Sequence, residues 1–295
     1  TSNSSDATSY TWTNNTSSLG LPANGSGNIP SFTAINTTTT PIVGTITVTP
    51  DFTNGGLICD GPSISFTVTV NPAAGGTGTV TDQDGNTYDY LTYGDQVWTV
   101  DNAEMVTYRD GTPIPEVTDP TQWSNLTTGA WSYYNNDPTK PRLYNWYAVM
   151  GIHDTDPNTP NKEFAPEGWH VPSDAEWTTL ENYLIANGYN YDGTTTENKI
   201  AKAMASTTGW ISSTEPGVPG NNQSLNNSSG FNAFPEGVRY DVGSFLNEGS
   251  LAIFWSSTEG STGSVWGRGL NYYNGYLSMS SGNKQYGFSV RFVRD

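Results

Sequence analysis

The stretch "GWHVPSDAEWTTLENYL", residues 168–184, combines the start of a helix with its apolar face. Ser173 and Glu176 have the S-x-x-E spacing of a capping box, in which each side chain accepts a hydrogen bond from the other residue's backbone amide. Pro172 disfavours helical geometry at the residue before it, which sharpens the predicted start. Apolar side chains then recur at helical spacing at Trp177, Leu180, Tyr183 and Leu184. The pattern predicts one amphipathic helix that ends at Asn187–Gly188.

His170 lies beside two acidic residues, a grouping that also occurs in metal and acid–base sites. Each acid, however, has a structural role at the helix start. Glu176 completes the capping box, and Asp174 lies in the first turn, where the helix dipole stabilises an anion. Trp169 and Val171 flank the histidine, as expected for a strand residue at a core. We therefore interpret His170 as a hydrogen-bonded framework residue.

Turns and short strands surround this helix. Asp84–Gly85 separates two alternating runs, which is the strongest short-range signal for a β-hairpin, and Asp110–Gly111 predicts another turn. The segment 194–206, "TTTENKIAKAMAS", is predicted to form a second helix because Glu197 follows Thr194 by three residues ahead of an apolar stripe. The predicted fold of this larger unit is α+β, with two helices and strands over the rest.

Residues 1–72 differ from the rest of the chain in charge and aromatic content. The first 108 residues contain no Lys or Arg, and nine of the ten tryptophans lie beyond residue 72. Apolar residues alternate with Thr and Ser at Ile46 and Val48, and again at Ile64, Phe66 and Val68, which predicts half-buried strands. We predict a strand-rich unit at 1–72, a Pro/Gly linker at 73–78 and a second unit at 79–295.

The formal net charge of −17 makes nucleic acid an improbable partner, because phosphates would be repelled. No apolar run is long enough to span a bilayer. The first ten residues lack the features of a signal peptide, yet Thr- and Asn-rich chains with few lysines are usually exported, so we expect an extracellular or cell-surface location. The single cysteine, Cys59, excludes an intrachain disulfide and is expected to be a small buried residue.

The N-terminal unit carries "YTWTNN", "GSGNIPSFTAINTTTTPI" and "ITVTPDFTNGGLICDGPSISFTVTVNP". These segments resemble the PKD-like, immunoglobulin-type modules of Bacteroidota surface proteins, and the resemblance implies a β-sandwich. Such modules usually begin with one more strand that carries a cysteine. We therefore expect the chain to start inside a module, with Cys59 at a position whose disulfide partner is missing. An open sheet edge would result, where a neighbouring chain or module could pair.

The larger unit carries seven motifs in order: "DGNTYDYLTYGDQVW", "YRDGTPIP", "LYNWYAV", "APEGWHVPSDAEWTTLENYL", "GFNAFPEGVR", "FWSSTEG" and "YGFSVRFVRD". Together they resemble the FISUMP domain, the Fibrobacter succinogenes major paralogous domain. The resemblance covers residues 79–295 and implies a C-type-lectin-like fold, with two helices flanking a twisted, mostly antiparallel sheet. Many members carry cysteines where this chain has Ala165 and Phe292, which implies that an apolar contact replaces a structural disulfide.

Asp154, Asp156 and Asn158 have the one-three-five spacing of a calcium loop. Thr159 stands where the loop requires glycine, and Ala165 where it requires glutamate. A solvated acidic loop is the simpler interpretation, and calcium is retained as a candidate cofactor.

Catalytic patterns are missing from the sequence. There is no G-x-S-x-G, no H-E-x-x-H and no Gly-rich phosphate loop. Formylglycine-generating enzymes share the C-type-lectin-like fold but need a cysteine pair, which the larger unit lacks. The sequence does not exclude the paired carboxylates of a glycosidase. However, no recognisable motif surrounds any of the five candidate glutamates: Glu181, Glu215, Glu236, Glu248 and Glu259. We expect the protein not to be an enzyme.

The C-terminal segment between Trp266 and Tyr286 is rich in aromatic residues, Asn, Ser and Gly. Aromatic side chains supply contact area at low entropic cost, and small polar residues supply adaptable hydrogen bonds. In C-type-lectin-like receptors that retroelements diversify, the same region is the variable ligand-binding face. The predicted ligand contacts are Trp266, Arg268, Asn271, Tyr272, Tyr273, Tyr276 and Asn283. Val265, Leu270, Phe288, Val290 and Phe292 are expected to point into the core.

The sequence thus predicts a bacterial adhesion or binding protein, whose lectin-like domain recognises a carbohydrate or a host or neighbour-cell protein. One alternative is a structural subunit of a filament, pilus or surface layer that assembles by strand addition through the open N-terminal edge. A second alternative is a glycan-active hydrolase.

Overall fold

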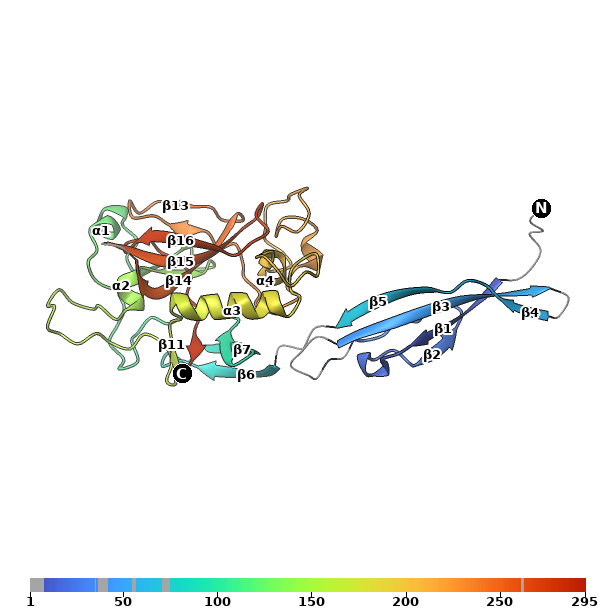
Figure 1. Ribbon diagram of the computed structural model, residues 1–295. Coiled ribbons are helices and arrows are strands. Elements are labelled where there is room, and N and C mark those ends of the chain that lie inside the picture. The colour runs from blue at the N-terminus through green and yellow to red at the C-terminus, as the bar shows by residue number, and fades with distance from the viewer. Residues whose placement is uncertain (1–7, 35, 37–41, 55–56, 71–74, 261–262) are drawn as a thin grey trace. The chain divides into compact units, whose positions relative to one another are not determined.

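The computed structural model of the chain describes residues 8–34, 36, 42–54, 57–70, 75–260 and 263–295. These residues are mostly β, with several antiparallel sheets and four α-helices (Figure 1). The chain divides into two compact units, Thr1–Ala73 and Ala74–Asp295. The predicted linker, 73–78, lies partly outside the described residues, and its described part, 75–78, begins a strand. Within the described part of the chain, no helix is long and apolar enough to cross a bilayer.

The described residues of the first unit form a single sheet around one long strand, so they do not form the two packed sheets of the predicted β-sandwich. The strands are β1 (Thr8–Asn14), β2 (Asn24–Ser26), β3 (Ile42–Asn54), β4 (Leu57–Asp60) and β5 (Ile64–Val70). β3 lies in the middle, because β1 pairs along one of its edges while β4 and β5 pair along the other. β2 extends the sheet beyond β1. The predicted alternating strands are therefore confirmed as β3 and β5.

Burial in this sheet is confined to its centre. Trp12 and Ile46 are buried with Leu21, which comes from the loop between β1 and β2. In contrast, Ile64 is 73% exposed and Phe66 is 44% exposed, so the prediction that this strand is half-buried is wrong at these two residues. The loop covers the middle of the sheet, and no other layer among the described residues packs over the start of β5. Cys59 is exposed too, contrary to expectation.

The second unit contains three larger structural parts: two sheets and one long helix. Its strands are β6 (Gly75–Thr81), β7 (Thr87–Tyr93), β8 (Gln96–Thr99), β9 (Trp131–Tyr133), β10 (Arg142–Tyr144), β11 (Trp169–His170), β12 (Val238–Arg239), β13 (Phe245–Leu246), β14 (Leu251–Glu259), β15 (Ser264–Asn271), β16 (Ser278–Asn283) and β17 (Val293–Arg294). Its helices are α1 (Pro120–Ser124), α2 (Trp146–Val149), α3 (Asp174–Ala186) and α4 (Ala201–Met204). One sheet has the order β11-β17-β8-β7-β6 and another β14-β15-β16, while β9-β10 and β12-β13 form small ribbons.

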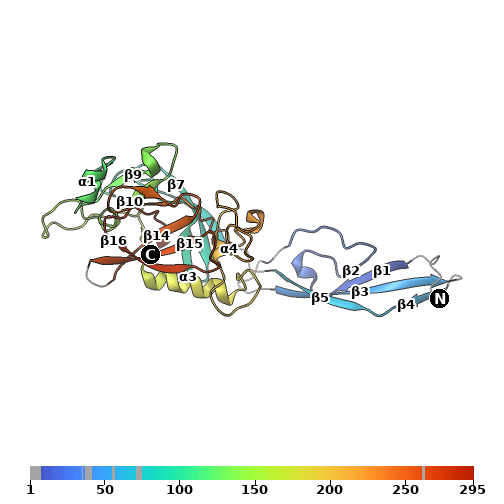
Figure 2. The ribbon, with the colours of Figure 1, turned by 90° about the horizontal axis from the view of Figure 1, so that it is seen from above.

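Helix α3 packs against both of the larger sheets. Figures 1 and 2 show it running along β14 and β15, and it also contacts β7. Its Trp177 ring lies 4.7 Å from the ring of Trp98 on β8 and 5.7 Å from that of Phe254 on β14. Leu180 and Leu184 are buried on the same face. The predicted helix and its apolar face are confirmed, and the helix joins the two sheets into one core.

Two predictions about the helices are wrong. The described residues contain four α-helices rather than two, and the second predicted helix, 194–206, shrinks to α4. The reason lies in Asn190, whose side-chain amide donates hydrogen bonds to the backbone carbonyls of Thr196 and Glu197. Glu197 consequently has a φ of 63°, which is incompatible with a helix. The Thr194 hydroxyl bonds to Asp192 and so does not cap a helix.

Candidate functional site

His170 is held between two carboxylates at the beginning of α3. Its Nδ1 lies 2.6 Å from Asp295 Oδ1, and its Nε2 lies 2.8 Å from Glu176 Oε1. Burial lowers the pKa of His170, but the hydrogen bonds to Asp295 and Glu176 outweigh it and raise that pKa above its ordinary value. The other oxygen of Glu176 accepts from the amide and hydroxyl of Ser173, which forms the predicted capping box. His170 therefore ties β11, α3 and the C-terminus together.

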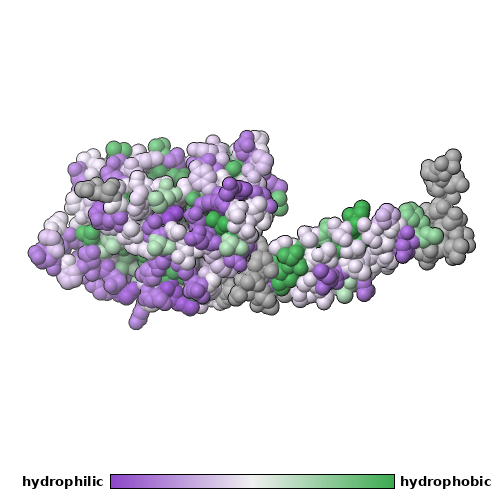
Figure 3. All heavy atoms as spheres, viewed as in Figure 1, coloured by the Kyte–Doolittle hydropathy of each residue, from purple (hydrophilic) through white to green (hydrophobic). Residues whose placement is uncertain are grey.

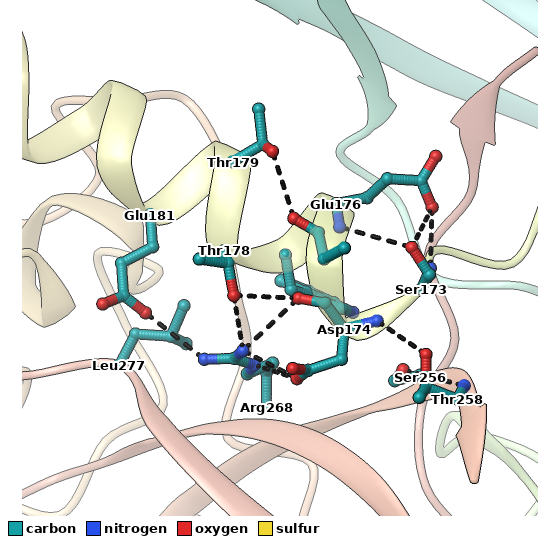
Figure 4. Close-up of polar contacts among 12 residues, drawn as sticks. Ser173, Asp174, Glu176, Thr178, Thr179, Glu181, Ser256, Thr258, Arg268 and Leu277 are labelled. Carbon is teal, nitrogen blue, oxygen red and sulfur yellow. Dashed lines mark hydrogen bonds and ion pairs between the residues drawn. The ribbon is translucent and has the colours of Figure 1, made fainter.

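Arg268 on β15 also binds the beginning of α3 (Figure 4). Its side chain is almost completely buried, and its Nη2 and Nε lie 2.6 and 3.0 Å from Asp174 Oδ1. The same guanidinium donates to the Thr178 hydroxyl at 2.9 Å and to Glu181 Oε2 at 3.3 Å. Because these acceptors all belong to α3, the structure places Arg268 in the joint between helix and sheet. It is not brought together with the other predicted ligand contacts.

The remaining predicted contacts fall at opposite ends of the hairpin formed by β15 and β16. Trp266 pairs opposite Ser281 near one end, where Asn283 donates a hydrogen bond to Asp241 at 3.1 Å. Asn271, Tyr272, Tyr273 and Tyr276 lie at the other end, in and before the connecting turn. Six residues of extended strand separate Trp266 from Tyr272, which corresponds to about 20 Å. The predicted ligand contacts other than Arg268 therefore lie in two separate places on one hairpin.

We call residues 271–276 the tyrosine turn. Tyr273 and Tyr276 are 52% and 47% exposed, and Tyr272 packs edge-on against Tyr273 with ring centroids 4.9 Å apart. Backbone hydrogen bonds fix the turn to three other segments: from Tyr272 N to Ser250 O, from Gly220 N to Tyr272 O, and from Ala201 N to Gly275 O, at 3.0–3.1 Å. The turn thus presents aromatic rings from an anchored backbone.

Sequence reasoning missed two exposed side chains from the loops that anchor this turn. Tyr191 and Ile211 are each 49% exposed. Tyr191 packs against Gly217, where any β-carbon would clash with its ring, and Gly217 O in turn lies near Gly275 of the turn. The only sequence signal was the aromatic and glycine content of these loops, because contacts between segments this far apart leave no local pattern.

The predicted calcium residues lie in one exposed loop. Asp154 Oδ1 accepts a hydrogen bond from the amide of Asp156, and Asp156 Oδ1 accepts from the amide and side chain of Asn158. These Asx turns shape the loop and point each acceptor at its own backbone. Within the described residues, no group of three His, Cys, Asp or Glu side chains is arranged to hold a metal. Calcium binding through Asn158 and the two aspartates stays a prediction.

The five candidate glutamates of the hydrolase alternative lie in different surroundings. Glu181 binds Arg268, while Glu248 and Glu259 form ion pairs with Lys140 and Lys284. Glu215 is exposed. Glu236 differs from the other four because it lines a pocket of about 440 Å³, where burial raises its pKa to about 7.

The class defined by this geometry is a mostly β, two-unit protein whose larger unit carries an anchored aromatic turn and a polar pocket. Residues 91–294 match the model of the Fibrobacter succinogenes major domain, which covers most of the chain. The chain therefore belongs to this family, and the resemblance based on the ordered motifs is confirmed. No curated protein and no solved structure matches the chain.

Proposed function

We propose that the chain is a secreted or cell-surface recognition protein that binds a carbohydrate or protein ligand through the tyrosine turn. In this proposal the larger unit has a C-type-lectin-like fold, and the first unit is an immunoglobulin-like module that carries it. Binding rests on aromatic contacts and hydrogen bonds, without a catalytic step.

The exposure of Tyr273 and Tyr276 on an anchored turn is the observation that carries this proposal. Rigid aromatic rings lose little conformational entropy when they bind, and their hydroxyls can bond to a polar ligand. On the face of the second unit seen in Figure 3, hydrophobic residues are scattered singly among hydrophilic ones. That face offers no broad apolar patch, so the half-exposed rings are better candidates for ligand contact.

A glycan and surface-protein array tests the proposal directly. The wild-type chain should give hits, and the double variant Tyr273→Ala/Tyr276→Ala should lose them without a large change in Tm. Tyr10→Ala is a matched control, because Tyr10 is exposed to a similar degree, 45%, but lies on β1 of the first unit. Undiminished hits in the double variant would place ligand recognition elsewhere.

The edge of β5 favours one second candidate, a filament subunit that assembles by strand addition. Among the described strands β5 pairs only with β3, and it exposes Ile64 and Phe66. Its sequence, "ISFTVTV", contains neither the lysine nor the proline that commonly blunts an edge strand. Polymers that Phe66→Lys converts to monomers would support assembly. A wild-type chain that is monomeric at every concentration would contradict it.

A further inference from the structure

The pocket that Glu236 lines has a different construction from the tyrosine turn and shares no residue with it. Its walls come from the start of β7, from residues 100–104 after β8, and from residues 232–236. Arg291 also lines it. At about 440 Å³ the pocket is large enough for a small ligand.

A chain of hydrogen bonds fixes the polar groups of this pocket. The buried Arg291 donates from Nε to Asn102 Oδ1 at 2.5 Å, and Asn102 donates from Nδ2 to Glu236 Oε2 at 2.5 Å. Ser289 donates its hydroxyl to the same oxygen at 2.7 Å. No donor from the described residues reaches Glu236 Oε1, so this oxygen remains available to a ligand in the pocket.

Both terminal nitrogens of Arg291 bond to backbone carbonyls. Its Nη1 bonds to the backbone carbonyls of Thr99 and Phe231, and its Nη2 bonds to that of Asn232. The guanidinium therefore orients Asn102 and, through it, Glu236. The other charged groups of the wall, Asp101 and Glu104, are acidic, and Glu104 is paired with Arg142.

Phe234 adds an apolar surface to the same wall. Its side chain is 41% exposed, although it lies only two residues from Glu236. An exposed aromatic ring in the same pocket as side-chain amides and a carboxylate oxygen that has no protein donor matches the two surfaces of a pyranose. The ring can pack on the sugar's C–H face, while the carboxylate and amides bond to its hydroxyl groups.

We propose that this pocket is a binding site for a neutral sugar, with Glu236 Oε1 accepting from sugar hydroxyls and Phe234 packing on the ring. Acidic sugars are disfavoured, because the charged wall groups other than the buried Arg291 are carboxylates. The fixed position of Glu236 supports a ligand role, because Asn102 and Ser289 both donate to its other oxygen, Oε2. The proposal is independent of the tyrosine turn.

Saturation-transfer NMR of the full chain tests this site, with glucose, galactose, mannose and N-acetylglucosamine as probes and glucuronic acid as the acidic comparison. At least one neutral sugar should bind, and Phe234→Ala should weaken it at least about tenfold. Glu236→Gln should also weaken binding, because it exchanges a carboxylate for an amide of the same shape. Val242→Ala is the matched control, as Val242 is 66% exposed and outside the pocket.

The outcomes separate this pocket from the tyrosine turn. Neutral-sugar binding that survives Tyr273→Ala/Tyr276→Ala and is lost in Phe234→Ala supports the proposal. Binding that is lost only in the tyrosine variant overturns it and assigns the sugar to the turn. Absence of binding by all four neutral sugars, or equal binding of glucuronic acid, also overturns it.

Discussion

Replacing Arg268 by methionine should destabilise the second unit, because Arg268 is the buried ionic link between β15 and α3. The substitution keeps the length of the side chain but leaves Asp174 and Glu181 without their cation. Removing one partner of a buried pair costs about 3–5 kcal/mol. The Asp174 and Glu181 side chains are 26% and 20% exposed, so solvent screening reduces the expected loss of stability to about 2–3 kcal/mol. A unit of this size would then lose about 5–10 °C in Tm.

Thermal and denaturant unfolding of the full chain measure this loss, and Arg294→Met provides a matched control. Arg294 is exposed on β17 and stacks only loosely on Tyr90, with 5.9 Å between its Cζ and the ring centroid. A double-mutant cycle with Asp174→Asn should give a coupling energy of about 1–3 kcal/mol. If Arg268→Met melts with the wild type but loses ligand binding, Arg268 is a ligand contact after all and the structural assignment is refuted.

Three further predictions concern other residues. Burial raises the pKa of Glu236 from 4.5 to about 7, so the free energy of unfolding of the wild type should fall by up to about 3 kcal/mol as the pH rises from 4 to 8. Glu236→Gln should remove this pH dependence. Equal pH dependence of stability in the two proteins would argue against a buried carboxyl. Ser173→Ala should lower the free energy of unfolding by about 1 kcal/mol through loss of the capping box, whereas Ser224→Ala, at an exposed position in a short 3-10 turn, should not. If Asp154 and Asp156 bind calcium, Tm should rise with calcium and fall with a chelator, and Asp156→Asn should abolish the response; an unchanged Tm would remove calcium as a cofactor.

Local interactions were predictable from the sequence, and those between distant segments were not. The capping box at Ser173 and Glu176 is confirmed because it involves residues three positions apart. The contact of Arg268 with α3 could not be predicted, because its partner Asp174 lies 94 residues away. The short helices α1 and α2 were missed although Asp119 and Asn145 cap them, because one helical turn has too little apolar periodicity to be distinguished from a β-turn.

The alternating sequence pattern predicted which residues of β15 are buried, but not that both faces of this strand are covered. Val265 and Leu270 are both buried as predicted, yet they lie on opposite faces of β15. Val265 packs in the core cluster that contains Phe288, and Leu270 packs in the one that contains Trp177. The alternating pattern assumes that one face of the strand is exposed to solvent, but α3 covers that face of β15. The proposed binding face consequently narrows from the whole hairpin to its connecting turn.

The affinity of the tyrosine turn for its ligand is the most direct test of the proposed function. Titration calorimetry should compare the wild-type chain with Tyr273→Ala/Tyr276→Ala, using the strongest ligand from the array. We predict that the double variant binds at least about tenfold more weakly at an unchanged Tm, as expected when two contact rings are removed. Equal Kd values for the two proteins would contradict the account.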